Sequence, residues 1–195
     1  LLWFGWFGFN AGSALGANGL AASAFVTTHA SAAAATVSWV LAEWLYSGKP
    51  TVLGAVSGCV AGLVAITPGA GFVSPLSSII IGLAGGVICF FSVSVMKAKL
   101  GYDDALDAFG VHGVGGTFGA IATGLFASKE INPAGADGFF FGNTDQLLIQ
   151  VIGVVASWAV AIIMTYVLIK IISVFMPIRS TEDDEISGLD IADHG

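Results

Sequence analysis

The sequence carries very little charge. Only 10% of its 195 residues are Asp, Glu, Lys or Arg, whereas soluble domains carry roughly 25%. Apolar residues make up 56% of the chain, and the mean hydropathy is +0.90. This composition excludes a soluble globular domain. It predicts an all-α, polytopic protein of the lipid bilayer, for which we expect no nucleic-acid partner.

The acidic residues are unevenly spread, so the formal net charge of -7 does not describe the whole surface. Six of the thirteen acids fall within the last fourteen residues. The negative charge therefore belongs to a C-terminal tail, in which Glu182–Glu185 is best interpreted as a solvated linker.

Cysteine is also scarce. Cys59 and Cys89 each lie in an apolar run, where a thiol behaves as a small hydrophobe, so neither a disulfide framework nor a metal site is indicated. We expect no cofactor. The apolar start, Leu1–Phe4, has no initiator Met and no basic region, which is unlike a signal peptide. We expect the chain to begin inside a transmembrane helix, as a fragment of a longer protein.

Apolar runs separated by turn residues predict about five and a half membrane spans. A span needs roughly 20 residues, and Gly, Pro and Asn separate the runs. We expect a helical membrane domain at 1–176 and a cytoplasmic tail at 177–195. The expected helices are a partial one at 1–15 and full ones at 21–45, 52–68, 76–96, 103–126 and 146–176.

The basic residues assign the two sides of the membrane. If successive helices alternate in direction, five of the six basic residues lie on one side. These five are Lys49, Lys97, Lys99, Lys170 and Arg179, opposite Lys129. By the positive-inside rule the first side is cytoplasmic. We therefore expect a multi-pass protein of the cell (plasma or inner) membrane whose C-terminus faces the cytoplasm.

Glycine is abundant and paired at helical spacing, which favours close packing of helices. The small-xxx-small pairs are Gly12 and Gly16, Gly82 and Gly86, and Gly115 and Gly119. Gly113, Gly115 and Gly116 are also expected to leave space beside His112.

An ionisable group inside an expected span is the strongest functional signal. Asp103 and Asp104 suit a helix N-terminus, where free N–H groups favour anions. His112 would then lie about nine residues, or roughly 14 Å, along the helix. Because such groups are costly in a bilayer, function is the default hypothesis. Asp107, about 140° around the helix from His112, is expected to give structural support by bonding backbone or a polar partner.

A second candidate group lies in the first helix, where Trp6, Phe9 and Ser13 share one face. Aromatic faces attract cations, and a Ser oxygen accepts from an N–H donor. The alternative interpretation is that the rings are packing groups or interfacial anchors and that Ser13 bonds its own backbone.

His29 competes with His112. It lies about eight residues into its own helix, at a depth not far from that of His112. Two histidines on different helices could ligate a haem, as in membrane cytochromes. A haem-binding oxidoreductase is therefore one possible function.

Several motifs resemble those of the ammonium transporter (Amt/Mep/Rh) family, in the family's order and over essentially the whole chain. These motifs are Gly5–Ser13, Ala65–Pro68, Asp103–Gly116 and Gly188–Gly195. The family's subunit has eleven helices in two inverted halves around a pore, and three subunits form a homotrimer. The chain resembles the part from the sixth helix onward, which implies an incomplete inverted-repeat fold and a transporter or channel rather than an enzyme.

The resemblance implies roles for individual residues. His112 would be one of two facing pore histidines, and Trp6 would line the conduit near them. Phe9 would be one of two outer gate phenylalanines, and Ser13 would lie at the outer site that recruits ammonium. Ala108 would line the pore. Ser57 would lie towards the inner exit, while Asp104, Asp107 and Thr67 would support the structure.

The family's other pore residues belong to its first half, and His29 does not correspond to the partner histidine. In the tail, Gly188, Asp190 and His194 would contact neighbouring subunits, and a PII-type regulatory protein would bind there in some members. Ala192 and its neighbours replace a Thr that is phosphorylated in some relatives.

The residue types fit this function. Moving a bare ammonium ion through an apolar tube is costly, so we expect ammonium, or methylammonium as its analogue, to lose a proton and cross as the neutral amine. A histidine at position 112 suits such a passage, because an imidazole can offer hydrogen bonds and a path for a proton. The main alternative is an ammonium sensor that signals through the cytoplasmic tail.

Overall fold

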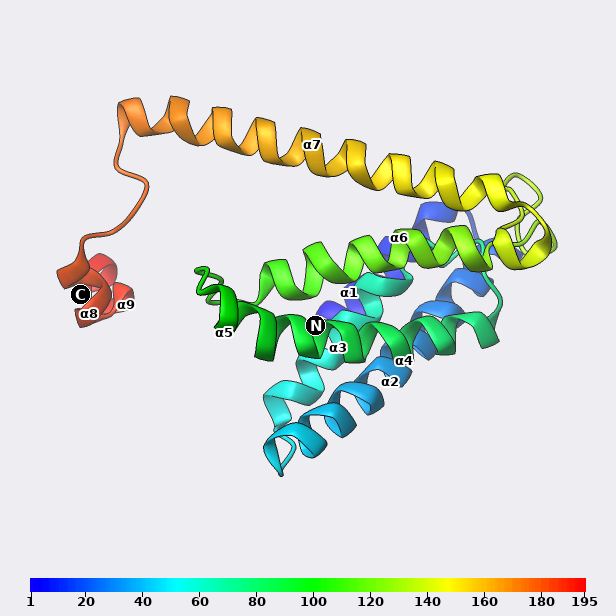
Figure 1. Cartoon of the computed structure of the whole chain (residues 1–195), viewed down its shortest axis with the longest axis horizontal. Helices are drawn as coiled ribbons and strands as arrows, with labels where there is room; N and C mark the ends of the chain where they lie inside the picture. Colours follow the sequence, from blue (N-terminus) through cyan, green and yellow to red (C-terminus); the bar gives the residue numbers. More distant parts are fainter. The chain divides into compact units, whose positions relative to one another are not determined.

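The computed structural model describes residues 1–195 and confirms an all-helical fold (Figure 1). Two compact units are present, Leu1–Val154 and Val155–Gly195. The chain has four helical segments long and apolar enough to cross a membrane, and one shorter apolar helix, α3. The helices are α1 (Leu2–Asn10), α2 (Gly19–Ser47), α3 (Val52–Ile66), α4 (Pro75–Phe91), α5 (Lys97–Leu100), α6 (Val114–Phe126), α7 (Thr144–Phe175), α8 (Glu182–Ser187) and α9 (Leu189–His194).

Short turns of other helical types interrupt this series. The 3-10 turns are η1 (Gly12–Ala14) and η4 (Phe139–Phe141), and the π turns are η2 (Ser92–Met96) and η3 (Phe109–Gly113). Thus η2 and α5 continue α4, and η3 leads into α6. The expected boundary at 176/177 between membrane domain and tail stays a prediction; α7 ends at Phe175.

Local capping explains why most helices begin where the sequence predicts. Asn18, Thr51 and Ser74 precede α2, α3 and α4, and each side chain accepts a backbone N–H three residues later. Such caps satisfy donors that the first turn of a helix leaves free. At the other end of α2, Gly48 has φ +78, a conformation that glycine adopts without strain.

Helix α2 is the centre of the first unit and packs against α1, α3 and α4. Gly62 of α3 and Gly82 of α4 both face the Ser31 backbone, and a Cβ at either would overlap the Ser31 carbonyl oxygen. The Ser31 hydroxyl donates to the Gly62 carbonyl at 2.8 Å. Small residues thus allow a close approach that a buried hydrogen bond reinforces.

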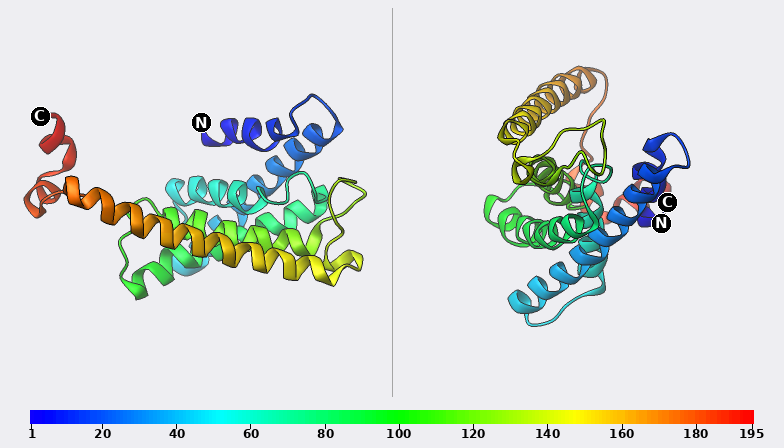
Figure 2. Two further views of the ribbon diagram at one scale, coloured as in Figure 1. Left: turned by 90° about the horizontal axis from the view of Figure 1, so that it is seen from above. Right: turned by 90° about the vertical axis from the view of Figure 1, so that its right-hand side faces the viewer.

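Two of the three expected glycine pairs confirm this packing. Gly82 and Gly86 press on α2, and Gly119 presses on the Ala65 backbone of α3. Helices α4 and α6 run side by side in the views of Figures 1 and 2 and are in contact. The prediction for Gly12 and Gly16 was wrong, because this segment leaves the helix at η1 and a Cβ at Gly12 would meet nothing within 4 Å.

The helix that carries His112 begins later than predicted. The sequence predicts a helix from 103, but regular helical structure starts at the π turn η3, Phe109–Gly113. Asp107 has φ +56, a left-handed conformation in which an α-helix does not continue. His112 therefore lies within the first turn, roughly 5 Å along the axis rather than 14 Å. The angular relation expected between Asp107 and His112 does not apply either.

Within the second unit, Thr181 accepts the Asp184 N–H and starts α8, and Gly188 at φ +93 separates α8 from α9. The Arg179 guanidinium bonds Glu185 through two nitrogens, at 2.9 and 3.1 Å. This pairing lowers the pKa of the Glu185 carboxyl below its usual value. Asp190 and His194 are exposed on α9, and their expected subunit contacts stay a prediction.

Replacing Gly82 should weaken the bundle. In Gly82→Ala the new methyl overlaps the Ser31 carbonyl, so α2 and α4 must separate, and overpacking of this kind costs about 1–3 kcal/mol. We expect a lower thermal unfolding midpoint for the full-length protein in detergent. Gly153→Ala is the matched control, because a Cβ there meets nothing within 4 Å. Equal midpoints for the two variants would contradict the close approach.

Candidate functional site

His112 lies in η3, a turn of π-helix, on the first helical turn before α6. Such turns are rare and occur frequently at functional sites. The imidazole is exposed, and it stacks on the indole of Trp6 with ring centroids 6.3 Å apart and planes 28° apart. Residues from α1 and η3, more than a hundred positions apart in the sequence, are thereby brought together.

Trp6 is held in place from α3. Its indole N–H donates to the Thr67 hydroxyl oxygen at 2.7 Å, and that hydroxyl donates its own proton to the Leu63 carbonyl at 2.7 Å. Since an indole N–H only donates and a carbonyl only accepts, this direction is the only one possible. Thr67 thus fixes the ring that stacks on His112.

Phe9 and Ser13 lie beyond Trp6 on the same part of the chain. The Phe9 ring is 59% exposed and meets Trp6 edge to face, with centroids 5.8 Å apart. Ser13 donates to the Phe9 carbonyl at 2.6 Å, as the alternative interpretation of the sequence predicts. Because this bond uses the hydroxyl proton, the Ser13 oxygen keeps its lone pairs for an incoming donor.

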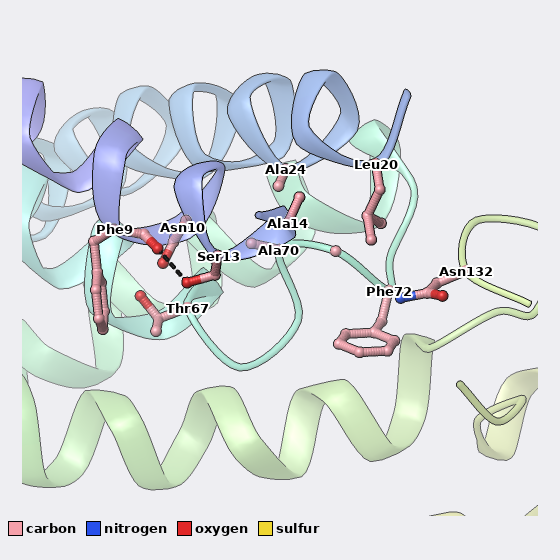
Figure 3. Close-up of a pocket in the computed structure, with 11 residues that line it drawn as sticks. Phe9, Asn10, Ser13, Ala14, Leu20, Ala24, Thr67, Ala70, Phe72 and Asn132 are labelled. Carbon is pink, nitrogen blue, oxygen red and sulfur yellow. Dashed lines mark hydrogen bonds between the residues drawn. The ribbon is translucent and has the colours of Figure 1, made fainter. Parts of the chain in front are cut away.

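A pocket of about 340 Å³ lies beside Phe9 and Ser13, where α1 ends (Figure 3). Phe9, Ser13 and Thr67 line it, and two of them contact Trp6: Thr67 accepts its indole N–H and Phe9 meets its ring. Its wall also includes residues that sequence reasoning missed. These are Asn10, Ala14, Leu20, Ala24, Ala70, Gly71, Phe72 and Asn132.

The missed residues differ in how visible they are in the sequence. Asn10 follows Phe9 directly, and an amide within an apolar helix is a recognisable signal. Phe72 and Asn132 come from two separate loops. The Ser128 N–H donates to the Phe72 carbonyl at 2.8 Å and joins these loops, a pairing that no local pattern indicates.

The space expected beside His112 is smaller than its glycines suggest. A Cβ at Gly113 would meet the Phe109 ring, and one at Gly115 would meet the Cys89 sulfur. Only Gly116 leaves ordinary room, with its nearest neighbour 3.9 Å from an added Cβ. Cys89 is buried, consistent with its place in an apolar run.

Asp104 and Asp107 hold the start of the helix in different ways. The Asp104 carboxylate accepts the backbone N–H groups of Ala108 and Phe109, each at 2.9 Å. Asp107 forms an ion pair with Lys97, whose ammonium group also donates to the Asp104 carbonyl at 3.0 Å. Lys97 thus fastens the end of one expected span to the start of the next.

The remaining candidates lie apart from the stacked rings. Ala108 is exposed where the helix begins, one turn before His112, and Ser57 is half-buried on α3, ten residues before Thr67. His29 contacts a tilted Trp3 ring, with centroids 5.2 Å apart, and stacks on Phe7, with centroids 6.2 Å apart. The two imidazoles therefore contact different rings.

Comparison with known proteins gives a consistent picture. A model of the Ammonium Transporter Family matches residues 1–195. An ammonium transporter of Bacillus subtilis (strain 168) is 56% identical over 195 residues, which are 100% of this chain and 48% of the relative. One of Aquifex aeolicus (strain VF5) is 50% identical over 195 residues, covering 100% of this chain and 45% of the relative. The chain therefore spans about half the length of the curated relatives it matches.

Solved structures agree with the fold. A crystal structure of Saccharomyces cerevisiae Mep2 is similar with a TM-score of 0.88 and 35% identity, covering 93% of this chain and 42% of that one. A structure titled "Sensor Amt Protein" is similar with a TM-score of 0.86 and 30% identity, covering 100% of this chain and 47% of that one. The expected all-helical, polytopic membrane fold is thus confirmed.

Thr67→Val should leave the Trp6 indole N–H without its acceptor. An unsatisfied, partly buried donor costs about 1–3 kcal/mol, so we expect a lower thermal midpoint of the full-length protein in detergent. Thr67→Ser retains the oxygen and should unfold at nearly the wild-type temperature. If both variants match the wild type, the Thr67 hydroxyl does not hold Trp6.

Proposed function

Because the chain belongs to the ammonium transporter family, we propose that the full-length protein moves ammonium across the cell membrane, past Trp6 and His112. The observation that carries this proposal is the continuous series from the pocket to the imidazole. Thr67 lines the pocket and bonds Trp6, and Trp6 stacks on His112.

Recruitment takes place at the pocket. The exposed face of Phe9 attracts a cation by roughly 0.5–1 kcal/mol at an exposed site. The Ser13 oxygen, whose proton is already donated to Phe9, accepts an N–H bond from the ion. An aromatic face beside an accepting oxygen suits ammonium, which has both positive charge and N–H donors.

Passage beyond the pocket favours the neutral amine. The groups that follow are the Trp6 indole, whose N–H is already bonded, and the His112 imidazole, and these two rings do not replace the full hydration shell of a bare cation. Desolvating an unpaired charge there costs many kcal/mol, so the ion transfers a proton to solvent water at the open pocket and passes on as neutral ammonia. The imidazole of His112 then exchanges hydrogen bonds with ammonia. Potassium has no proton to release and is rejected.

The wider setting follows from charge and from the family. We place the C-terminus and the loop with Lys97 and Lys99 in the cytoplasm, where five of the six basic residues lie. The functional assembly is a homotrimer. The tail segment Gly188–Gly195 contacts neighbouring subunits and is the site for a PII-type regulator.

Ammonium sensing is a second candidate function, favoured by the likeness to the solved structure titled "Sensor Amt Protein". The same pocket would detect the ion, and the tail would pass on the signal. Uptake of labelled methylammonium by cells that produce the full-length protein separates the two. Uptake above that of cells lacking the protein supports transport, whereas binding without uptake supports sensing alone.

Replacing His112 should alter selectivity. In His112→Asp a carboxylate stabilises a cation in the passage, so we expect potassium to compete with methylammonium uptake and conduction to change by at least about tenfold. Uptake assays of the full-length variant, with and without potassium, measure both effects. His29→Gln is the control and should keep wild-type discrimination. If His112→Asp discriminates as well as the wild type, His112 does not border the path.

A haem protein would behave differently. If His29 and His112 bound haem, the purified full-length protein would show a Soret band that either substitution reduced. We expect no such band in the wild-type spectrum.

A further inference from the structure

One polar side chain of the pocket has not yet been given a role. Asn10 is only 9% exposed, although it lies at the end of α1 in an otherwise apolar stretch. It lines the pocket with Phe9 and Ser13, and Figure 3 draws it beside them. Buried amides in membrane helices are costly unless they are bonded, so the orientation of this group is informative.

The Asn10 amide is held by Thr28 of α2. The Asn10 nitrogen Nδ2 donates to the Thr28 hydroxyl oxygen at 3.0 Å. That hydroxyl donates its single proton to the Ala24 carbonyl at 2.6 Å. A carbonyl has no proton to give, so the Thr28 oxygen is left as an acceptor only.

This network fixes which end of the amide faces Thr28. Only the NH₂ end can bond an oxygen that only accepts, so the carbonyl oxygen Oδ1 must point elsewhere. No hydrogen bond within the chain reaches Oδ1, and it is not among the polar atoms that are sealed from solvent without a partner. Asn10 thus offers the pocket an oriented, unoccupied acceptor.

We propose that Asn10 Oδ1 accepts an N–H bond from the ion held between Phe9 and Ser13, and that Thr28 is the positioning residue that keeps this oxygen turned to the pocket. The inference rests on the proposed function, in which an N–H-bearing cation enters there. Two accepting oxygens, from Asn10 and Ser13, together with one ring face then select ammonium and methylammonium as hydrogen-bond donors.

The test measures the KM and maximal rate of labelled methylammonium uptake by the full-length protein. Thr28→Val keeps the shape but removes the acceptor, so the amide is free to turn. We expect its KM to rise about tenfold, the size of one lost hydrogen bond, with the maximal rate within about twofold of wild type. Thr28→Ser restores the hydroxyl and should restore the KM.

Asn10 variants test the acceptor itself. Asn10→Ala should raise the KM about tenfold or more, because the accepting oxygen is lost. Asn10→Asp is nearly the same shape and adds charge, so it should lower the KM and slow release, which reduces the maximal rate. Thermal midpoints in detergent show whether each variant is folded.

The outcomes separate the inference from the function beneath it. If the wild type takes up methylammonium while Thr28→Val, Asn10→Ala and Asn10→Asp, all folded, keep the wild-type KM, Asn10 is only structural and the inference is wrong. Equal losses of maximal rate in Thr28→Val and Thr28→Ser, with the KM unchanged, also overturn it. If the wild type itself shows neither uptake nor binding, the proposed function fails and this inference fails with it.

Discussion

The site depends on hydroxyl groups that donate their protons to their own helix. Ser13, Thr28 and Thr67 each donate to the carbonyl four residues earlier. A lipid-embedded helix has no water to satisfy such hydroxyls, so this local bond is the cheapest way to satisfy the proton. Because the proton is used in this bond, each hydroxyl oxygen can only accept further hydrogen bonds. The indole N–H of Trp6 and the NH₂ end of Asn10 are oriented by this constraint.

The same hydroxyls need a rigid frame if their directions are to persist. Glycines of α3 and α4 press on the backbone of α2, and Ser31 bonds the carbonyl of Gly62 across the contact. Close-packed interiors do not deform continuously. The frame therefore fixes the distance between Thr28 on α2 and Thr67 beside α3, and with it the two sides of the pocket.

The sequence revealed much of the frame because its signals are local. Caps at Asn18, Thr51 and Ser74 and the glycine at 48 lie within a few residues of the helix ends they set, so most boundaries were predicted within two residues. The start of the His112 helix was not. Two aspartates at 103 and 104 indicate an N-terminus, and Asp104 does cap the helix, but across four residues of loop. In that loop the backbone of Asp107 has a left-handed conformation, and its carboxylate forms an ion pair with Lys97. This contact joins separate segments, so the periodicity of the sequence does not predict it.

The residues of the pocket also divide into those that local sequence signals predict and those that they do not. Trp6 and Phe9 lie on α1 and Ser13 follows in the turn η1, so their association was predictable from their closeness in the sequence. Phe72 and Asn132 reach the pocket through loop pairing alone. The role of Asn10 was hidden for a different reason. An Asn in a helix gives no sign of which end of its amide is bonded, and only the hydrogen bond from Thr28 to Ala24 decides it.

Under the proposed function, this direction of hydrogen bonding would also account for how one chain attracts a cation and then excludes it. At the pocket the free groups are oxygens that accept and a ring face, both of which favour a donor with positive charge. Next to the pocket, the Thr67 oxygen already accepts the Trp6 indole N–H, and the ring stacked on Trp6 is the imidazole of His112. An ion that keeps its charge finds too few acceptors there to replace its water. Under the proposed function, a neutral amine, which both donates and accepts hydrogen bonds, matches an imidazole, so the change from oxygen acceptors to His112 would itself select for loss of the proton.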